Sequence, residues 1–189
     1  MEQVNRMCGN EPIFTILPFC QMKAAVVTTG SEVYHGRIED KFTPVVKEKL
    51  RECGMEVIGD TLCSDDADMV TEAVKKWIEQ GAELVCTGGM SVDPDDRTPL
   101  AIRNAADEVI TYGAPVLPGA MFMLAYAGKV PIMGLPGCVM YAKRTIFDLI
   151  LPRIAAGERL KAEDFTALGE GGLCLNCPVC TFPNCSFGK

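Results

Sequence analysis

Residues 84–100 read LVCTGGMSVDPDDRTPL, and this stretch decides the fold class. An apolar run ends at a glycine pair, three aspartates follow within four residues, and a Thr-Pro pair then marks a helix start. A buried strand that passes through a polar turn into a helix is typical of parallel α/β sheets. In such sheets ligands bind beyond the carboxyl ends of the strands. The stretch therefore predicts both an α/β fold and a binding loop.

Strand and helix patterns alternate on both sides of this stretch. Buried strands are predicted at residues 23–29, 55–62, 83–87, 108–113 and 130–137, with a hairpin within residues 114–129. Helices are predicted at residues 42–53, 69–80 and 98–106 and from about residue 139 to residue 154. This order predicts a three-layer α/β/α fold with a mostly parallel central sheet and a short Cys-rich C-terminal tail.

Composition and length narrow the class of protein. The 189 residues suffice for one main domain, which we place at residues 23–160, between a linker remnant at residues 1–22 and the Cys-rich tail at residues 161–189. The net charge of −7 argues against a nucleic acid or an anionic membrane as partner. No run approaches the roughly 18 apolar residues of a membrane span, and no signal peptide is recognisable, so we expect a cytoplasmic protein.

The glycines and aspartates after the third strand have two interpretations. Gly88 and Gly89 let backbone amides approach an anion, and the helix that starts at Thr98 adds its positive dipole end. The aspartates of this edge suit a phosphate only if a divalent cation such as Mg²⁺ lies between them and the phosphate; they are Asp65, Asp66, Asp93, Asp95 and Asp96. Alternatively, these aspartates are solvent-exposed turn and cap residues.

Four motifs in order resemble the molybdopterin-binding domain family, which includes MogA, MoaB and MoeA. They are TTGSEVYHGRI from residue 28, SDDADMV from residue 64, TGGMSVDPDDRTP from residue 87 and MGLPGCVMYAKRTIFDLILPRI from residue 133. The GGMSV form and the LPG before a helix are closer to the MoeA, molybdenum-inserting branch. The resemblance covers about residues 23–160.

The resemblance implies a function and a set of site residues. It implies binding of molybdopterin, or of its adenylylated form, and help with molybdenum insertion from molybdate, with Mg²⁺ and a dimeric or trimeric homo-oligomer. If the protein is an enzyme, it is molybdopterin molybdenumtransferase-like. The matched catalytic and Mg²⁺-binding positions are Asp65 and Asp96. The matched cofactor-binding positions are Thr29, Gly30, Ser31, Glu32, Thr87, Gly88, Gly89, Met90, Ser91, Asp93, Thr98, Pro136 and Gly137.

Departures from the family pattern support an alternative function. A lysine-containing segment of the family corresponds to PVLPGAM at residues 115–121, which has no lysine. Lys143 and Arg144 are candidates for the missing positive charge, although a solvated helix face is the simpler interpretation. The alternative is a non-catalytic pterin-binding sensor or carrier module with a metal- or cluster-binding Cys tail. CinA-type proteins share the domain, so a nucleotide pyrophosphatase is a further alternative.

Four of the ten cysteines form a separate motif near the C-terminus. Cys174, Cys177, Cys180 and Cys185 follow a Cys-x2-Cys-x2-Cys-x4-Cys spacing. Three cysteines at such short intervals resemble an iron–sulfur ligand run more than a Zn²⁺ site, whose cysteine pairs lie farther apart. A reduced disordered tail and disulfides are the alternatives. The other six cysteines are expected to be reduced and to pack as small apolar residues.

Overall fold

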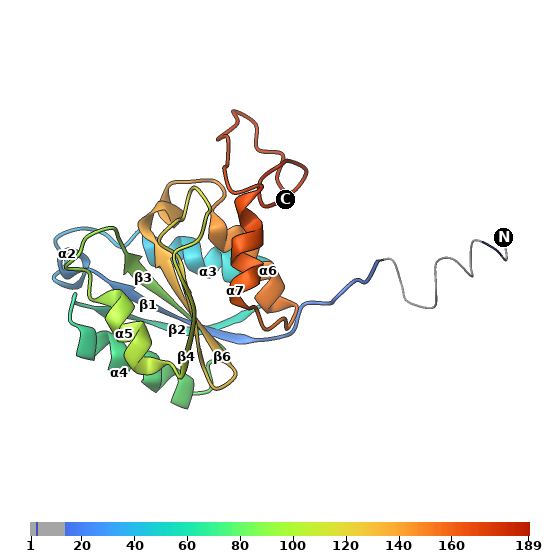
Figure 1. The fold of residues 1–189 in the computed structure, drawn as a ribbon. Coiled ribbons are helices and arrows are strands. Elements are labelled where there is room, and N and C mark those ends of the chain that lie inside the picture. Colours follow the sequence, from blue (N-terminus) through green and yellow to red (C-terminus); the bar gives the residue numbers. More distant parts are fainter. Residues whose placement is uncertain (1–2, 4–13) are drawn as a thin grey trace.

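A six-stranded sheet forms the centre of the chain in the computed structural model, which describes residue 3 and residues 14–189 (Figure 1). The strands lie in the order β2-β1-β3-β6-β5-β4. Three of the five strand pairs are parallel, and β5 and β4 add the antiparallel part. The predicted mostly parallel sheet is therefore confirmed. The strands are β1 (Lys23–Thr29), β2 (Glu56–Cys63), β3 (Leu84–Met90), β4 (Glu108–Tyr112), β5 (Met123–Ala127) and β6 (Val130–Pro136).

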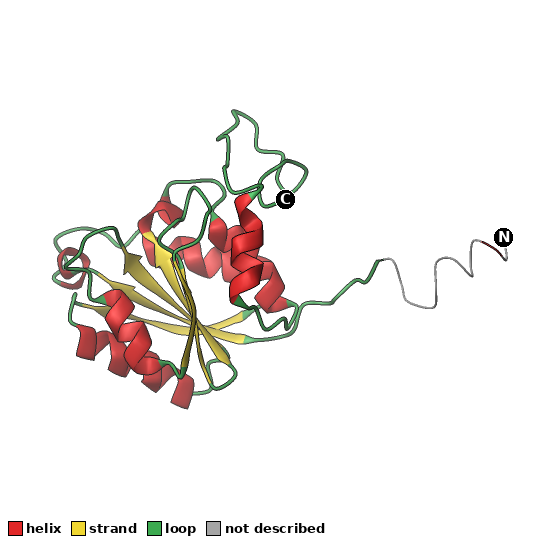
Figure 2. Cartoon of the chain, viewed as in Figure 1, coloured by secondary structure: helices red, strands yellow, loops and turns green. Residues whose placement is uncertain are grey.

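Helices cover both faces of this sheet, as Figure 2 shows. One apolar cluster joins α3, α6 and α7 to one face, and a second joins α4 and α5 to the other. The three-layer prediction is thus confirmed. The helices are α2 (Ser31–Tyr34), α3 (Phe42–Glu52), α4 (Ala67–Glu79), α5 (Thr98–Ala105), α6 (Ile146–Ala155) and α7 (Ala162–Thr166), with 3-10 turns η1 (Gly137–Met140) and η2 (Ala167–Gly169).

Strand β1 explains why its sequence is apolar without alternation. Ala24 and Val26 point into one apolar cluster, whereas Ala25 and Val27 point into the other. Successive side chains of a strand face opposite sides, so a strand covered on both faces needs apolar residues at every position. The continuous apolar run in β1 therefore follows from the covering of both faces.

The last long helix begins later than the sequence pattern predicts. We expected it from about residue 139, but residues 137–140 form η1 and α6 starts only at Ile146. The Thr145 hydroxyl accepts a hydrogen bond from the Phe147 amide at 3.2 Å, and the Thr145 amide donates to Asp148 Oδ2 at 2.8 Å. This reciprocal cap fixes the helix start, because it satisfies amide groups that otherwise have no partner within the helix.

The predicted hairpin also differs in detail. Residues 114–129 contribute one strand, β5, and its hairpin partner is β6, which the sequence predicts as a separate strand. The two-residue turn contains Gly128, whose φ of +59° favours glycine. None of the described helices combines the length and the apolar character that a membrane crossing requires.

The predicted linker remnant at residues 1–22, including Cys8, falls mostly outside the described residues. Residues 14–22 leave the domain as an extended segment before β1 (Figure 1). In this segment the Cys20 amide donates a hydrogen bond of 2.7 Å to the carbonyl of Ala155, the last residue of α6. The three domain boundaries drawn from the sequence stay predictions.

Candidate functional site

A cavity of about 530 Å³ lies at the carboxyl ends of β1, β3 and β6. This is the edge at which the sequence predicts a binding site. Three of the predicted cofactor-binding residues line it, namely Thr29, Gly89 and Gly137. The remaining lining residues are Thr28, Val33, Ile38, Glu39, Asp40, Lys41, Phe42, Met140 and Tyr141.

The geometry around residue 89 explains why a glycine is required there. Gly89 has a φ of +87°, and a Cβ placed there would lie 1.7 Å from Thr29 Oγ1. The Thr29 hydroxyl is held in this position, because it donates to the Gly88 carbonyl at 2.9 Å and lies 3.4 Å from Thr98 Oγ1. Only glycine combines this φ with so close an approach. The sequence predicts that the third strand ends at residue 87, but β3 continues through the glycine pair to Met90, and its pairing with β6 is irregular between Thr87 and Met90. The glycine pair thereby exposes backbone to the cavity and connects β1 to the start of α5 through the Thr29 hydroxyl.

The aspartates that follow the glycine pair accept hydrogen bonds from backbone amides of their own loop. Asp96 accepts hydrogen bonds from the Ser91 amide and from the Thr98 amide, both at 2.8 Å. Asp93 accepts from the Asp95 amide at 2.9 Å. Backbone donors therefore stabilise these charges, which is one of the two interpretations that the sequence allows. The carboxylates shape the loop and do not line the cavity.

The loop after β2 is tied to the loop after β1 in a similar way. Asp65 Oδ2 accepts a hydrogen bond from the Ser31 amide at 2.9 Å. Asp66 caps α4, because its side chain accepts from the Met69 amide at 2.8 Å. The neighbouring aspartates thus have separate roles, one between loops and one at a helix start.

The other predicted cofactor-binding residues lie around this edge without lining the cavity. Thr87, Met90 and Pro136 are buried, and the Thr87 hydroxyl donates to the Met133 carbonyl at 3.4 Å. Glu32 is exposed on the short helix α2, and Gly30 precedes that helix. The structure therefore brings the predicted residues to one edge of the sheet, but only a subset reaches the cavity.

The predicted metal ligands do not form a ready metal site. Within residue 3 and residues 14–189, no three histidine, cysteine, aspartate or glutamate side chains are grouped so that they hold one metal ion. Asp65 and Asp96 instead accept backbone hydrogen bonds in their own loops. The same finding applies to the four C-terminal cysteines as ligands of a single ion.

Sequence reasoning missed the segment before α3. Asp40 accepts hydrogen bonds from the Phe42 amide at 2.8 Å and the Thr43 amide at 3.0 Å, and so orders the helix start. Lys41 lines the cavity, where it is the only basic residue among those that the structure describes. An aspartate just before a helical pattern is a recognisable cap signal, but no local pattern tells that this helix start faces β3.

The last loop of the site contributes an aromatic side chain. Tyr141, which follows η1, lines the cavity and is 79% exposed. Lys143 and Arg144, the sequence's candidates for added positive charge, are not among the lining residues and line a second cavity beside the C-terminal segment. The lining thus offers hydroxyl groups, backbone at Gly89, one lysine, two acidic residues (Glu39 and Asp40) and aromatic rings, and these groups suit a polar ligand with a flat apolar part.

Comparison with known proteins identifies the family of this chain. The family model described as "Probable molybdopterin binding domain" matches residues 25–156. A CinA-like protein of Mycobacterium tuberculosis is 35% identical over 77 residues, which are 40% of this chain and 18% of that protein. The chain thus spans less than a fifth of the length of this curated relative.

Two solved structures share the fold. The molybdopterin biosynthesis enzyme MoaB of Thermus thermophilus has a TM-score of 0.61 at 21% identity and covers 75% of this chain and 100% of its own. A molybdopterin biosynthesis protein of Mycobacterium abscessus has a TM-score of 0.62 at 21% identity, with 72% and 92% covered. At such identity these structures establish the fold alone. The matched model spans more than half of the chain and includes the whole glycine and aspartate edge, so the chain belongs to the molybdopterin-binding domain family.

Proposed function

We propose that this chain binds molybdopterin, or its adenylylated form, in the cavity at Gly89 and assists molybdenum insertion in molybdenum cofactor biosynthesis. The observation that carries the proposal is the cavity itself. It lies at the carboxyl edge of the sheet, within the residues of the matched family domain, and backbone at Gly89 forms part of its wall. The named relatives in molybdopterin biosynthesis are consistent with this role.

The chemistry of the cavity fits a pterin with a phosphate. A flat ring system can pack against the side chains of Phe42 and Tyr141. A phosphate can lie near the Lys41 amine and the backbone of Gly89. The negative charges of the aspartates in the neighbouring loops would repel a bound anion. Asp96 and Asp65, however, already accept hydrogen bonds from backbone amides. The unfavourable charge is therefore reduced before the ligand arrives.

Mg²⁺ is part of the proposal only together with the ligand. The described residues do not gather a complete ion site. In proteins, Mg²⁺ is commonly held by one or two carboxylates plus substrate phosphates. Measuring the affinity with and without Mg²⁺ therefore tests this part, and an unchanged affinity contradicts it.

Binding is tested by anaerobic titration with molybdopterin. We expect Lys41→Met to weaken binding about tenfold, because a charge-assisted contact to phosphate contributes roughly 1.4 kcal/mol. Lys129→Met is the matched control, because Lys129 is exposed in the turn at the opposite end of β6. No saturable binding, or equal weakening by both variants, would contradict the site.

Insertion is tested by complementation of a strain that lacks the molybdenum insertion step. Asp96→Ala removes the acceptor of the Ser91 and Thr98 amides, and we expect it to abolish rescue. Asp95→Ala is the control, since only the backbone amide of Asp95 takes part in this hydrogen-bond network. Full rescue by Asp96→Ala counts against a role in insertion.

A binding-only role is the second candidate, and one observation favours it. Among the described residues that line the cavity, Lys41 is the only basic one, so the cavity offers little positive charge to molybdate. A sensor or carrier would bind molybdopterin without transferring molybdenum. Measured transfer from molybdate to bound molybdopterin excludes this candidate. The homo-oligomer and the cytoplasmic location stay predictions, and light scattering and fractionation test them.

A further inference from the structure

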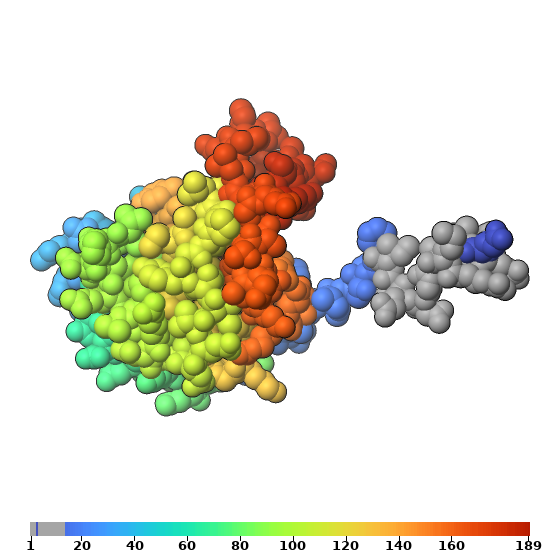
Figure 3. All heavy atoms as spheres, in the orientation of Figure 1, coloured from blue at the N-terminus to red at the C-terminus, as the bar shows by residue number. Residues whose placement is uncertain are grey.

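The C-terminal segment is folded against the domain. The Leu117 amide donates to the Gly172 carbonyl at 2.6 Å, and the Cys174 amide donates back to the Leu117 carbonyl at 2.8 Å. At the other end, the Gly188 amide donates to the Gly171 carbonyl at 2.7 Å. These bonds close residues 171–188 into a loop. Figure 3 shows this part of the chain as a lobe on the surface of the domain.

Apolar contacts hold the closed loop in place. Phe187 is only 3% exposed and belongs to the same core cluster as α3 and α6. Phe182 and Cys185 pack against that cluster. The alternative of a disordered tail therefore does not describe this segment.

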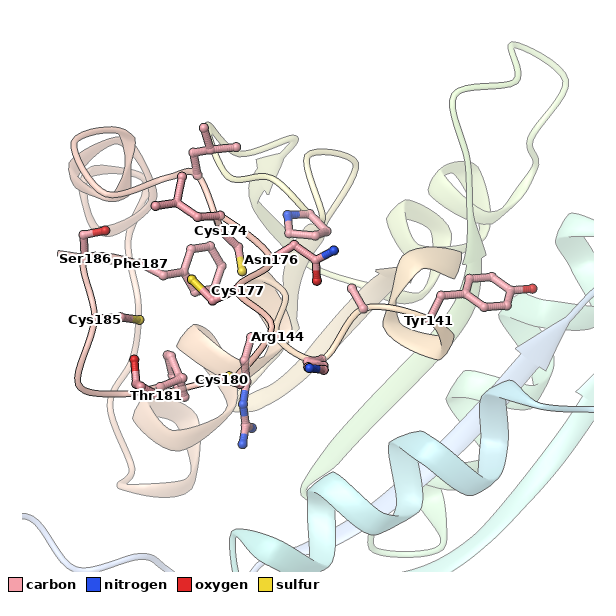
Figure 4. Close-up of a pocket in the computed structure, with 16 residues that line it drawn as sticks. Tyr141, Arg144, Cys174, Asn176, Cys177, Cys180, Thr181, Cys185, Ser186 and Phe187 are labelled. Atoms are coloured by element: carbon pink, nitrogen blue, oxygen red, sulfur yellow. The ribbon is translucent and has the colours of Figure 1, made fainter.

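A cavity of about 340 Å³ lies within and beneath this loop. All four cysteines of the C-terminal motif line it, and Figure 4 shows their sulfur atoms around it. The loop itself adds the apolar side chains of Leu173, Leu175, Phe182 and Phe187 and three polar residues, and the remaining lining residues come from residues 118 and 141–144 of the domain. Its volume lies at the lower end of the range of cofactor and ligand sites. The loop thus places four potential thiolate ligands around one space.

The arrangement distinguishes between a single ion and a cluster. A Zn²⁺ ion needs four ligands within about 2.3 Å of one point. Among the described residues, no three such side chains converge in that way. An iron–sulfur cluster has several iron atoms, and each cysteine ligates a different corner. The short cysteine spacing, together with the cavity that all four cysteines share, therefore favours a cluster over one ion.

Disulfides are a poorer explanation of the same cysteines. Every cysteine that the structure describes is free, including those of the motif. Cys177 and Cys180 are exposed, whereas Cys174 and Cys185 are half-buried against the core. The loop is already closed by backbone hydrogen bonds and by Phe187, so a disulfide is not needed to hold it.

Positive charge borders the cavity on the side of the domain. Lys143 and Arg144 both line it. The Lys143 amine donates to the Pro178 carbonyl at 3.2 Å, and the Arg144 guanidinium lies 5.0 Å from the centre of the Phe182 ring. A cluster with four thiolates carries net negative charge, which the Lys143 amine offsets, whereas the Arg144 guanidinium is also paired with Asp148 at 2.9 Å. Nearby charge is also one of the factors that set a cluster's reduction potential.

From these observations we propose that Cys174, Cys177, Cys180 and Cys185 ligate a four-iron iron–sulfur cluster in this cavity. Each thiol releases its proton to solvent when it binds iron, and the resulting thiolate sulfur forms the bond to iron. The cluster site is separate from the proposed pterin site and does not depend on pterin binding. Tyr141 lines both cavities, so the two sites are neighbours.

The proposal is tested by anaerobic reconstitution of the full chain with equal amounts of ferrous and ferric iron and with sulfide, which together supply the two ferric and two ferrous ions of an oxidised four-iron cluster. We expect about four iron and four sulfide per chain, and a broad visible absorption that dithionite bleaches. Cys177→Ser and Cys180→Ser each lower the bound iron at least twofold. Cys20→Ser is the matched control, because Cys20 is an exposed cysteine outside the motif, and it keeps full loading.

Other outcomes would overturn the cluster. These are one zinc per chain with no iron uptake, or full iron loading of the Cys177→Ser and Cys180→Ser variants. Circular dichroism of each variant verifies that the domain is folded. Lys143→Gln provides a second readout, because it removes a positive charge next to the cavity without removing a ligand. We expect this variant to keep its iron and to show a more negative reduction potential, and an unchanged potential contradicts the placement beside Lys143.

Discussion

Asp65 Oδ2 accepts a hydrogen bond from the backbone amide of Ser31 at 2.9 Å. This contact joins the loop after β2 to the loop after β1 at the edge of the sheet that carries the cavity. The sequence resemblance predicts a catalytic role for Asp65, so its charge and its structural role need to be separated.

Two substitutions of Asp65 separate these roles. Asp65→Asn keeps an oxygen acceptor for the Ser31 amide but removes the charge, whereas Asp65→Ala removes both. If the loop contact is what matters for binding, Asp65→Ala weakens molybdopterin binding about fivefold, equivalent to roughly 1 kcal/mol, and Asp65→Asn has little effect. Equal losses in both variants would instead indicate that the charge is required. Titration calorimetry of the purified variants measures the difference.

The close approach of Thr29 to the backbone of Gly89 makes Gly89 sensitive to substitution. Gly89→Ala places a Cβ 1.7 Å from Thr29 Oγ1 at a φ of +87°, and we expect it to lower the free energy of unfolding by about 3 kcal/mol. Gly81→Ala is the control, because Gly81 has a φ of +92° but nothing within 4 Å of its Cβ position. It should cost about 1 kcal/mol. Urea unfolding of both variants measures this, and equal losses would refute the clash.

The buried carboxylate of Asp148 organises the start of α6. It accepts from Lys49 Nζ at 2.5 Å and from Arg144 at 2.9 Å, and its side chain is 4% exposed. Asp148→Ala leaves Lys49 without this partner, and we expect a loss of about 3 kcal/mol of stability. The control is Asp60→Ala, which breaks a more exposed pair with Lys47 and should cost under roughly 1 kcal/mol. Thermal unfolding ranks the two, and a larger loss for Asp60→Ala would contradict this account.

Thiol reactivity is expected to divide the cysteines by burial. Cys86 is fully buried, and burial strongly raises the pKa of its thiol, so iodoacetamide should leave it unmodified in the folded protein at mildly alkaline pH. Burial likewise raises the pKa of Cys63. Cys20 and Cys177 are exposed and should react. Mass spectrometry of peptides from native and unfolded protein locates the label, and early labelling of Cys86 would show that the core opens.

Protection of the motif links this experiment to the proposed cluster. Cys177 and Cys180 should react in the iron-free protein and become protected after reconstitution. Cys20 should react equally in both forms, because it lies outside the cavity.

The layers of the fold, and the edge of the sheet at which the cavity lies, could be predicted from the sequence. The apolar run of β1 and the alternation of strands with helices are local patterns, and each arises from covering both faces of a parallel sheet. The glycine pair and the Thr-Pro start of α5 likewise indicated where the chain passes from β3 to α5, because φ preferences and caps act within a few residues.

Which side chains line one cavity depends on the tertiary structure and could not be predicted from the sequence. Lys41 and Tyr141 lie 100 residues apart in the sequence and line one cavity, and no local pattern of either segment indicates this. The late start of α6 depends on the Thr145 and Asp148 cap, and Asp148 is in turn held by Lys49 on α3. Such contacts depend on how distant elements pack, whereas sequence periodicity reports only which face of an element is buried.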